Sequence, residues 1–197
     1  MEAASEARRS AARDSDSTAL NIGQRFQQGR SSYMKDATGN NNKIRGRLNL
    51  TVRSADGEVT ATRHASNMVL RKGAGVIARL FAGVDGAKPI DQIRVGFALE
   101  AGTAELTSLT PPKDSIPAAA LGSPLSNGSF KIATDKPDNI QVSVTAVFKP
   151  VVDLENVTEA GLLAGDDLYN QVVFEPVAMR AGENVTFFWE IDFPFGR

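Results

Sequence analysis

The residues near the C-terminal end alternate between two kinds of side chain. One set is strongly apolar: Val185, Phe187, Trp189, Ile191 and Phe193. The other set is mostly polar: Thr186, Phe188, Glu190 and Asp192. A period of two places the sets on opposite faces of a β-strand. The sequence therefore predicts a core strand here, so that the folded body occupies the later part of the chain.

The first 43 residues have a different composition, rich in Ala, Ser, Arg, Gln, Asn and Asp. After Leu20 their large apolar side chains are Ile22, Phe26, Tyr33 and Met34. Such a segment buries too little surface by itself to offset the entropy lost on ordering. We expect residues 1–43 to form an extended N-terminal arm, with these four side chains anchored in pockets of a neighbouring subunit. The alternative is that the arm folds back on its own domain.

The charge of the chain is divided in the same way. The 197 residues carry a net charge of −1, which offers no broad electrostatic basis for binding nucleic acid or an anionic membrane. Residues 1–47, however, hold nine Lys/Arg against five Asp/Glu, and the remainder holds thirteen against eighteen. This asymmetry either steers the arm toward an acidic surface or only keeps both parts soluble.

Composition excludes several kinds of site. The chain has no cysteine and one histidine, so disulfides, thiolate zinc sites, cysteine nucleophiles and sites with two imidazoles are impossible. No apolar run approaches the roughly 20 residues of a membrane-spanning helix. We therefore expect no membrane partner and no secretory signal, and a protein that is used in the cytosol or carried in a particle assembled there.

The first half of the body predicts a hairpin followed by a helix. Ile44 to Val52 and Glu58 to Arg63 alternate with period two around a turn at residues 54–57. Asn67 is then expected to cap a helix whose apolar residues recur at helical spacing up to Gly83, the expected C′ position.

The second half predicts further strands and one long loop region. Strands are expected at residues 92–100, with Phe97 and Leu99 inward, at 129–134, at 139–148 and at 171–176. Residues 101–139 contain several prolines and are expected to form mainly loops that contact a partner. The predicted fold is mainly β: an antiparallel β-sandwich or jelly-roll-like body over residues 44–197, with one amphipathic helix and the extended N-terminal arm.

No group of residues specifies catalysis, and we expect no catalytic residue, cofactor or metal. His64 has no local carboxylate that selects it for a Ser-His-Asp system, so a surface role is preferred. Asp153, Glu159, Asp166 and Asp167 form an acidic group without the spacing of an EF-hand, which favours a solvated loop or a partner for the arm over Ca²⁺. Phe188 and Phe195 are expected to face outward as possible interface residues.

Several short motifs resemble those of accessory structural proteins of tailed bacteriophages. They are Asn67-x-Val-Leu-x-x-Gly73, Ile77-Ala-Arg-Leu-Phe81-Ala-Gly83, Ile93-x-Val-Gly96, Glu159-Ala-Gly-Leu162 and Phe188-Trp-Glu-Ile191-x-Phe193. The resemblance covers residues 44–197 and implies a β-rich virion component without catalytic activity. It transfers no functional residue, and the arm lies outside it.

On this basis the chain is expected to be a decoration or cement protein of the phage head, located in the virion. Its expected partners are the major capsid protein or other virion proteins and further copies of itself, with no direct binding of nucleic acid. A neck, collar or tail and baseplate component, present in few copies, is the alternative within the same class. A carbohydrate- or receptor-binding module, with loops at 101–139 and Trp189 as a stacking platform, is the alternative from another class.

Overall fold

The computed structural model describes residues 43–195. Within them lie one α-helix, α1 (Arg71–Phe81), and two short 3-10 helices, η1 (Ala118–Leu121) and η2 (Asn127–Ser129). The strands are β1 (Arg45–Arg53), β2 (Val59–Val69), β3 (Gln92–Gly96), β4 (Gly122–Pro124), β5 (Phe130–Ala133), β6 (Asn139–Phe148), β7 (Leu154–Ala164), β8 (Asp167–Leu168), β9 (Asn170–Met179) and β10 (Asn184–Pro194).

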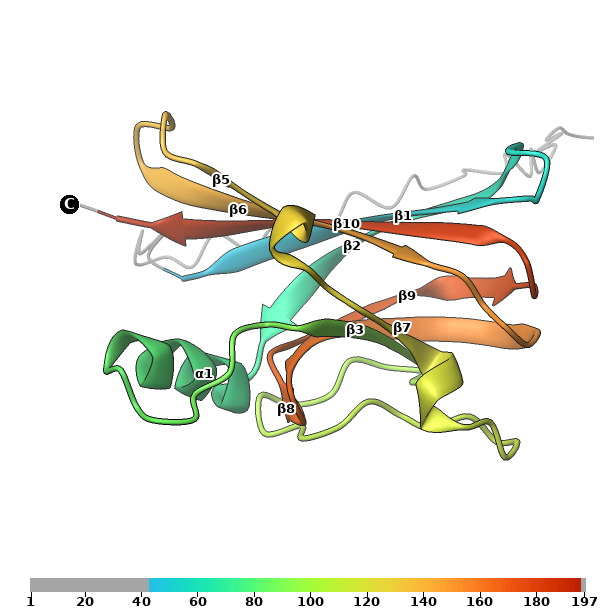
Figure 1. The fold of residues 1–197 in the computed structure, drawn as a ribbon, viewed down its shortest axis with the longest axis horizontal. Coiled ribbons are helices and arrows are strands. Elements are labelled where there is room, and N and C mark those ends of the chain that lie inside the picture. The colour runs from blue at the N-terminus through green and yellow to red at the C-terminus, as the bar shows by residue number, and fades with distance from the viewer. Residues whose placement is uncertain (1–42, 196–197) are drawn as a thin grey trace, which may run out of the picture. The chain divides into compact units, whose positions relative to one another are not determined.

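These strands form one antiparallel sheet that curls over itself. The strand order is β4-β3-β7-β9-β2-β1-β10-β6-β5, with β8 added to β7. Figure 1 shows β1, β10, β6 and β5 in one layer and β3, β7 and β9 in a second layer, with β2 passing between them. The predicted antiparallel β fold with one helix is thus confirmed for the described body. The two layers belong to a single continuous sheet, so the likeness to a jelly roll is loose.

The layers are joined at one corner by a short run of pairing. β2 and β9 pair only from Asn67 to Val69, and beyond that point the two strands diverge. There the guanidinium of Arg63 donates hydrogen bonds to the backbone carbonyls of Glu175 and Pro176, at 2.9 and 2.6 Å. Arg63 therefore satisfies strand-edge carbonyls that the diverging β2 no longer reaches.

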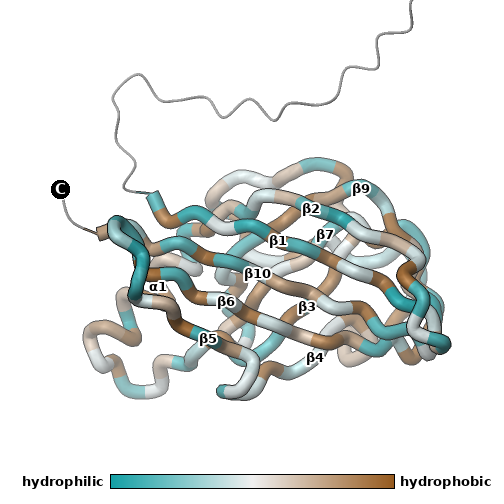
Figure 2. The backbone as a smooth tube through the Cα atoms, turned by 90° about the horizontal axis from the view of Figure 1, so that it is seen from above, coloured by the Kyte–Doolittle hydropathy of each residue, from teal (hydrophilic) through white to brown (hydrophobic). Residues whose placement is uncertain are grey.

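The core lies between the layers. Brown and teal alternate along β1 and β10 in Figure 2, which is the period-two pattern of the sequence. Val185, Phe187 and Trp189 are fully buried, Ile191 is nearly so, and Phe193 is half-buried. The rings of Phe187 and Trp189 stack with centroids 5.5 Å apart. The predicted C-terminal core strand is confirmed.

The predicted hairpin is confirmed, but its second strand is longer than expected. Gly57 takes the turn with a φ of 87°, and the backbone N–H of Ser54 donates to the carbonyl of Glu58 at 2.9 Å. β2 then continues to Val69, where the sequence analysis expected a helix. Asn67 as a helix cap is wrong, because it pairs with Gly46 of β1 and Val172 of β9 inside the sheet.

The helix starts only after this strand. Leu70 precedes α1 in an extended conformation and is fixed by a hydrogen bond from its N–H to the carbonyl of Tyr169 at 3.0 Å. The predicted end of the helix is right, since Gly83 follows with a φ of 61°, the left-handed conformation typical of a C′ residue.

Of the later strands, β3 differs from expectation, whereas β5 and β6 agree with it. β3 ends at Gly96, and Leu99, expected to face inward, is 90% exposed in the loop that follows. β6 has the predicted bounds and pairs with β10 on one side and with β5 on the other, so it is an interior strand as expected. The predicted strand near residues 129–134 is present as β5.

The loop after β3 forms a third layer over β7. Leu106 and Leu109 of this loop pack on a small cluster made by Leu70, Leu163 and Leu168. β7 is consequently buried on both faces from Val157 to Ala164. A strand covered on both sides has no alternation of apolar and polar residues, which is why the sequence pattern did not identify it.

Tyr169 gives the body a dependence on alkaline pH. Burial raises the pKa of its hydroxyl from 10.0 to about 12, since the charged form loses its hydration. The unfolded chain therefore loses this proton first as the pH rises. Its contribution to stability is complete below pH 10 and is lost between pH 10 and 12, by about 3 kcal/mol.

We expect Tyr169→Phe to remove this part of the alkaline destabilisation. The measurement is urea unfolding of both proteins at pH 9, 10, 11 and 12, from which the difference in unfolding free energy is plotted. A difference between wild type and variant that does not change over this range would contradict the assignment.

Candidate interaction surfaces

Exposed apolar side chains gather at one end of the body. They are Leu80, Phe81, Val84, Ile132, Ile140 and Phe195, called here the helix-end cluster. The first three lie at the end of α1 and just after it, and the others lie on β5, β6 and the residue after β10. Figure 1 shows these elements at the same end, where β1 also begins. Phe81 is 95% exposed and Ile132 is 69% exposed. Exposing such apolar side chains to water does not stabilise the folded protein.

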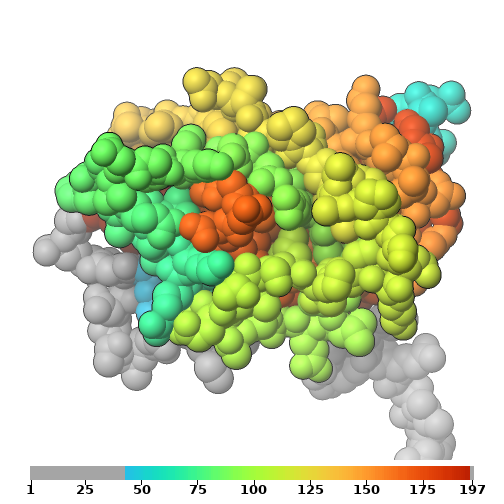
Figure 3. Space-filling model, turned by 60° about the horizontal axis from the view of Figure 1, so that its bottom comes forward, coloured from blue at the N-terminus to red at the C-terminus, as the bar shows by residue number. Residues whose placement is uncertain are grey.

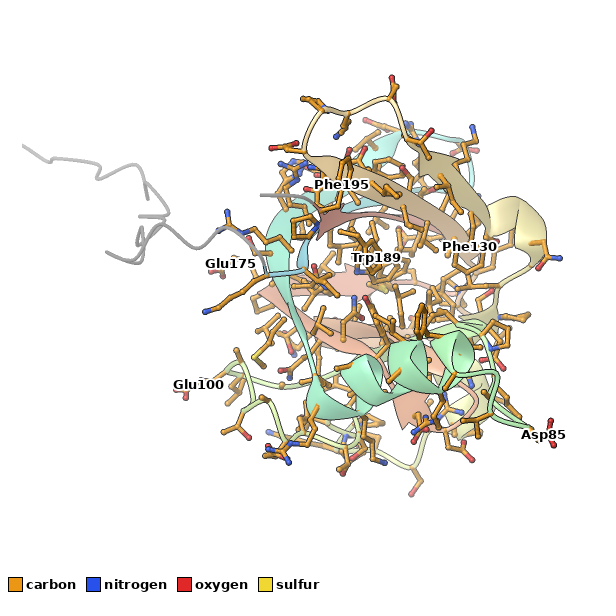
Figure 4. All side chains as sticks on the ribbon, turned by 90° about the vertical axis from the view of Figure 1, so that its left-hand side faces the viewer. Asp85, Glu100, Phe130, Glu175, Trp189 and Phe195 are labelled. Carbon is orange, nitrogen blue, oxygen red and sulfur yellow. The ribbon has the colours of Figure 1, made fainter. Side chains whose placement is uncertain are left out.

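Phe188 and Phe195, the predicted interface residues, lie on different surfaces. Phe195 is 50% exposed in the helix-end cluster, with its backbone N–H bonded to the carbonyl of Asp138 at 3.1 Å. Figure 4 looks onto this end and shows Phe195 at the rim of the upper layer, with Trp189 between the layers. Phe188 is half-buried on the outer face of β10, between Asn49 and Thr145.

Apart from Val147 of β6, which is 49% exposed, the outer face around Phe188 is polar. Arg47 of β1 lies 3.6 Å from the carboxylate of Glu190 and 3.9 Å from that of Asp192 on β10. Asp192 also accepts a hydrogen bond from the side-chain amide of Gln141 at 3.0 Å. Phe188 is thus a single aromatic ring within a polar face, whereas Phe195 belongs to an apolar group. The predicted arm anchors Ile22, Phe26, Tyr33 and Met34 lie outside the described residues.

His64 lies within β2, although the second strand of the hairpin was expected to end at Arg63. Its side chain is exposed, and Nδ1 is 2.5 Å from Oδ1 of Asn49 on β1. An amide in this position cannot supply the negative charge that the carboxylate of a Ser-His-Asp system provides to its imidazole. The arrangement is that of a polar cross-strand pair.

The structure separates the acidic residues that the sequence grouped together. Asp153 accepts from the backbone N–H of Ala181, and Asp167 pairs with Arg79 at 2.5 Å and with Lys72 at 3.6 Å. Glu159 is fully buried, so its expected place in a solvated loop is wrong. Among residues 43–195, no group of three or more acidic or histidine side chains is arranged to hold a metal ion.

Glu159 instead fastens the loop that covers β7. Its carboxylate accepts hydrogen bonds from the side-chain amide of Gln171 at 2.6 Å and from the backbone N–H of Thr110 at 2.9 Å. The N–H of Ala98 lies 3.4 Å from the same oxygen. Gly96 leaves the necessary space, because a Cβ there would lie 2.3 Å from the carboxylate. This network holds the loop at Ala98 near its start and again at Thr110.

Trp189 cannot serve as a stacking platform for a sugar, because it has no exposed surface. The carbohydrate-binding alternative therefore loses the aromatic residue on which it depended. The long loop region remains, but part of it covers β7, and β4 and β5 of the sheet arise within it.

A polar hollow lies on the outer face of the second layer, and sequence reasoning missed it. Its volume is about 490 Å³, and it is lined by Asp91, Gln92, Arg94, Ala118, Ala119, Gly122, Ser123 and Pro124. Figure 3 looks toward this face, with the β7–β8 turn in orange and η1 in yellow on either side of β3. Only the alternation of Gln92 and Arg94 with buried Ile93 and Val95 signalled that these side chains share one outer face.

Comparison of the chain with protein-family models, with curated proteins and with solved structures found no match. Within the described residues, no helix is both long and apolar enough to cross a bilayer.

Proposed function

We propose that this chain is a non-enzymatic structural protein of a tailed-bacteriophage virion, with decoration or cementing of the head as its most specific role. The motifs that resemble phage accessory proteins support the class. The observation that carries the role is the helix-end cluster, which holds six of the exposed large apolar side chains of the described body. An assembled particle would bury such a surface.

The attachment combines two contacts. The body docks on other virion proteins through the helix-end cluster, and residues 1–43 extend to adjacent subunits, with Ile22, Phe26, Tyr33 and Met34 as anchors. Two linked contacts, each weak, give strong overall attachment because the second forms at high effective concentration. An extended arm of this length reaches on the order of 140 Å.

Deletion of residues 1–43 tests the role of the arm. The truncated body is expected to keep the thermal midpoint of the full chain and to lose at least tenfold in affinity for particles, measured by co-sedimentation. A truncated protein that sediments with particles as well as the full chain would eliminate the clamp.

Phe81→Ser tests the docking surface. Because Phe81 is 95% exposed, the substitution should change the free energy of unfolding by less than about 0.5 kcal/mol. It should nevertheless weaken co-sedimentation with particles. Leu99→Ser, at a loop position 90% exposed and outside the helix-end cluster, is the matched control and should have no effect on either measurement.

Copy number separates head decoration from the neck and tail alternative. Quantitative mass spectrometry of purified particles, with the major capsid protein as the internal standard, should give hundreds of copies for decoration and about a dozen or fewer for a neck or tail component.

A further inference from the structure

Arg94 lies in the hollow over β3 and β4, and among residues 43–195 only the Nε of its guanidinium makes a hydrogen bond. It pairs across the sheet with Gly122 of β4, and a Cβ at that glycine would lie 2.9 Å from Cγ of Arg94 and 2.5 Å from the carbonyl oxygen of Ile93. The missing side chain of Gly122 therefore lets the arginine stem lie close to the sheet. This places the guanidinium within the hollow instead of above it.

The guanidinium is oriented by a chain of hydrogen bonds. Nε of Arg94 donates to Oε1 of Gln92 at 3.1 Å, and Nε2 of Gln92 donates to the backbone carbonyl of Gly165 at 2.6 Å. The N–H of Gly165 in turn donates to Oδ1 of Asp91 at 3.0 Å. Each member fixes the next, so Arg94 is held in one orientation before any ligand binds.

The two Nη groups of Arg94 have no hydrogen-bond or ion-pair partner among residues 43–195. Arg94 is a half-buried residue, and with its Nε bonded to Gln92 its free Nη groups present a planar set of donors. Such a fork matches the two oxygens of a carboxylate.

The walls of the hollow add to this preference. Ala118, Ala119 and Pro124 provide apolar contact for a short aliphatic stem, and among residues 43–195 Arg94 is the one cation that lines the hollow. Asp91 lies in the same lining and repels a group that concentrates two charges, as phosphate does, more than it repels one carboxylate group with a single charge.

We infer that the hollow over β3 and β4 binds a carboxylate carried on a short aliphatic stem, with Arg94 as the ligand-binding residue and Gln92 as the residue that positions it. Such a group belongs to an aspartate or glutamate side chain of a partner protein or to a small dicarboxylic acid. This inference does not depend on the proposed virion role.

The test is an NMR titration of the full chain that follows the Nε–H signals of its arginines. The probes are sodium glutarate and a short acetylated Asp-Glu peptide, with sodium phosphate and sodium chloride at matched ionic strength. The Arg94 signal is expected to shift saturably with a carboxylate probe, while the signal of Arg79, already paired with Asp167, stays in place. A response to glutarate indicates a small ligand, and a response to the peptide alone indicates a protein surface.

Two substitutions separate charge from geometry. Arg94→Lys keeps the charge but loses the fork and should weaken carboxylate binding at least tenfold, measured by calorimetry. Gln92→Ala leaves Arg94 in place and should weaken it several-fold. Thermal unfolding of each variant confirms that it is folded. Equal shifts with chloride, tighter binding of phosphate, or unchanged affinity in Arg94→Lys would each overturn the inference.

Discussion

Trp189→Ala is expected to lower the free energy of unfolding by about 3–5 kcal/mol, a large part of the stability of a domain of this size. Trp189 is fully buried, stacks on Phe187 and pairs through the backbone with Leu48 of β1 and Val144 of β6. Removal of the indole leaves a cavity in the core, beneath the adjacent strands β1, β10 and β6. Urea unfolding followed by far-ultraviolet circular dichroism measures the loss, because the variant has no tryptophan.

Trp189→Phe is the matched control. The indole Nε1 is buried without a hydrogen-bond partner among the described residues, so phenylalanine removes an unsatisfied donor while keeping most of the apolar volume. We expect it to cost much less than alanine. Equal losses for the two variants would show that packing at this position does not govern the stability of the body.

Glu159→Ala has the second largest expected effect, about 3 kcal/mol, with a local consequence as well. The substitution leaves the side-chain amide of Gln171 buried without its acceptor and removes the acceptor of the part-buried N–H of Thr110. The loop of residues 97–117 should then detach from β7 while the curled sheet stays folded. Hydrogen exchange followed by mass spectrometry should show faster exchange in this loop than in β1, β6 and β10.

Glu159→Gln keeps the size of the side chain and removes half of its accepting capacity. Its new amide group must face a donor, either the amide of Gln171 or the backbone N–H of Thr110. We expect a smaller loss of about 1–2 kcal/mol and partial release of the loop. Uniformly faster exchange over the whole body in both variants would contradict the local role of Glu159.

The elements that the sequence predicted best have one face buried and one face in water. β10, β6 and the β1–β2 hairpin show period-two alternation because the inner residues meet the core and the outer residues meet solvent. The helix end at Gly83 was predictable for another local reason, since it needs a residue that tolerates positive φ.

The predictions that failed depend on contacts between residues far apart in the sequence, which local sequence patterns do not show. Asn67 has the side chain of a helix cap, but pairing with both β1 and β9 keeps it in a strand. The sequence of β7 does not alternate between apolar and polar residues, because a loop that is distant in sequence covers the second face of the strand. The sequence predicted that Glu159 lies at the surface, because Gln171 and Thr110 meet it only in the folded chain. The Arg94 hollow depends in the same way on Gly122 and Gly165, which are remote in sequence.

The most direct test of the central claim is immunogold electron microscopy of intact phage particles whose genome encodes this chain, with an antibody raised against residues 44–197. The account predicts label distributed over the whole head. Label confined to one vertex or to the tail would keep the virion role and contradict decoration, and particles without label would contradict the claim that this is a virion protein.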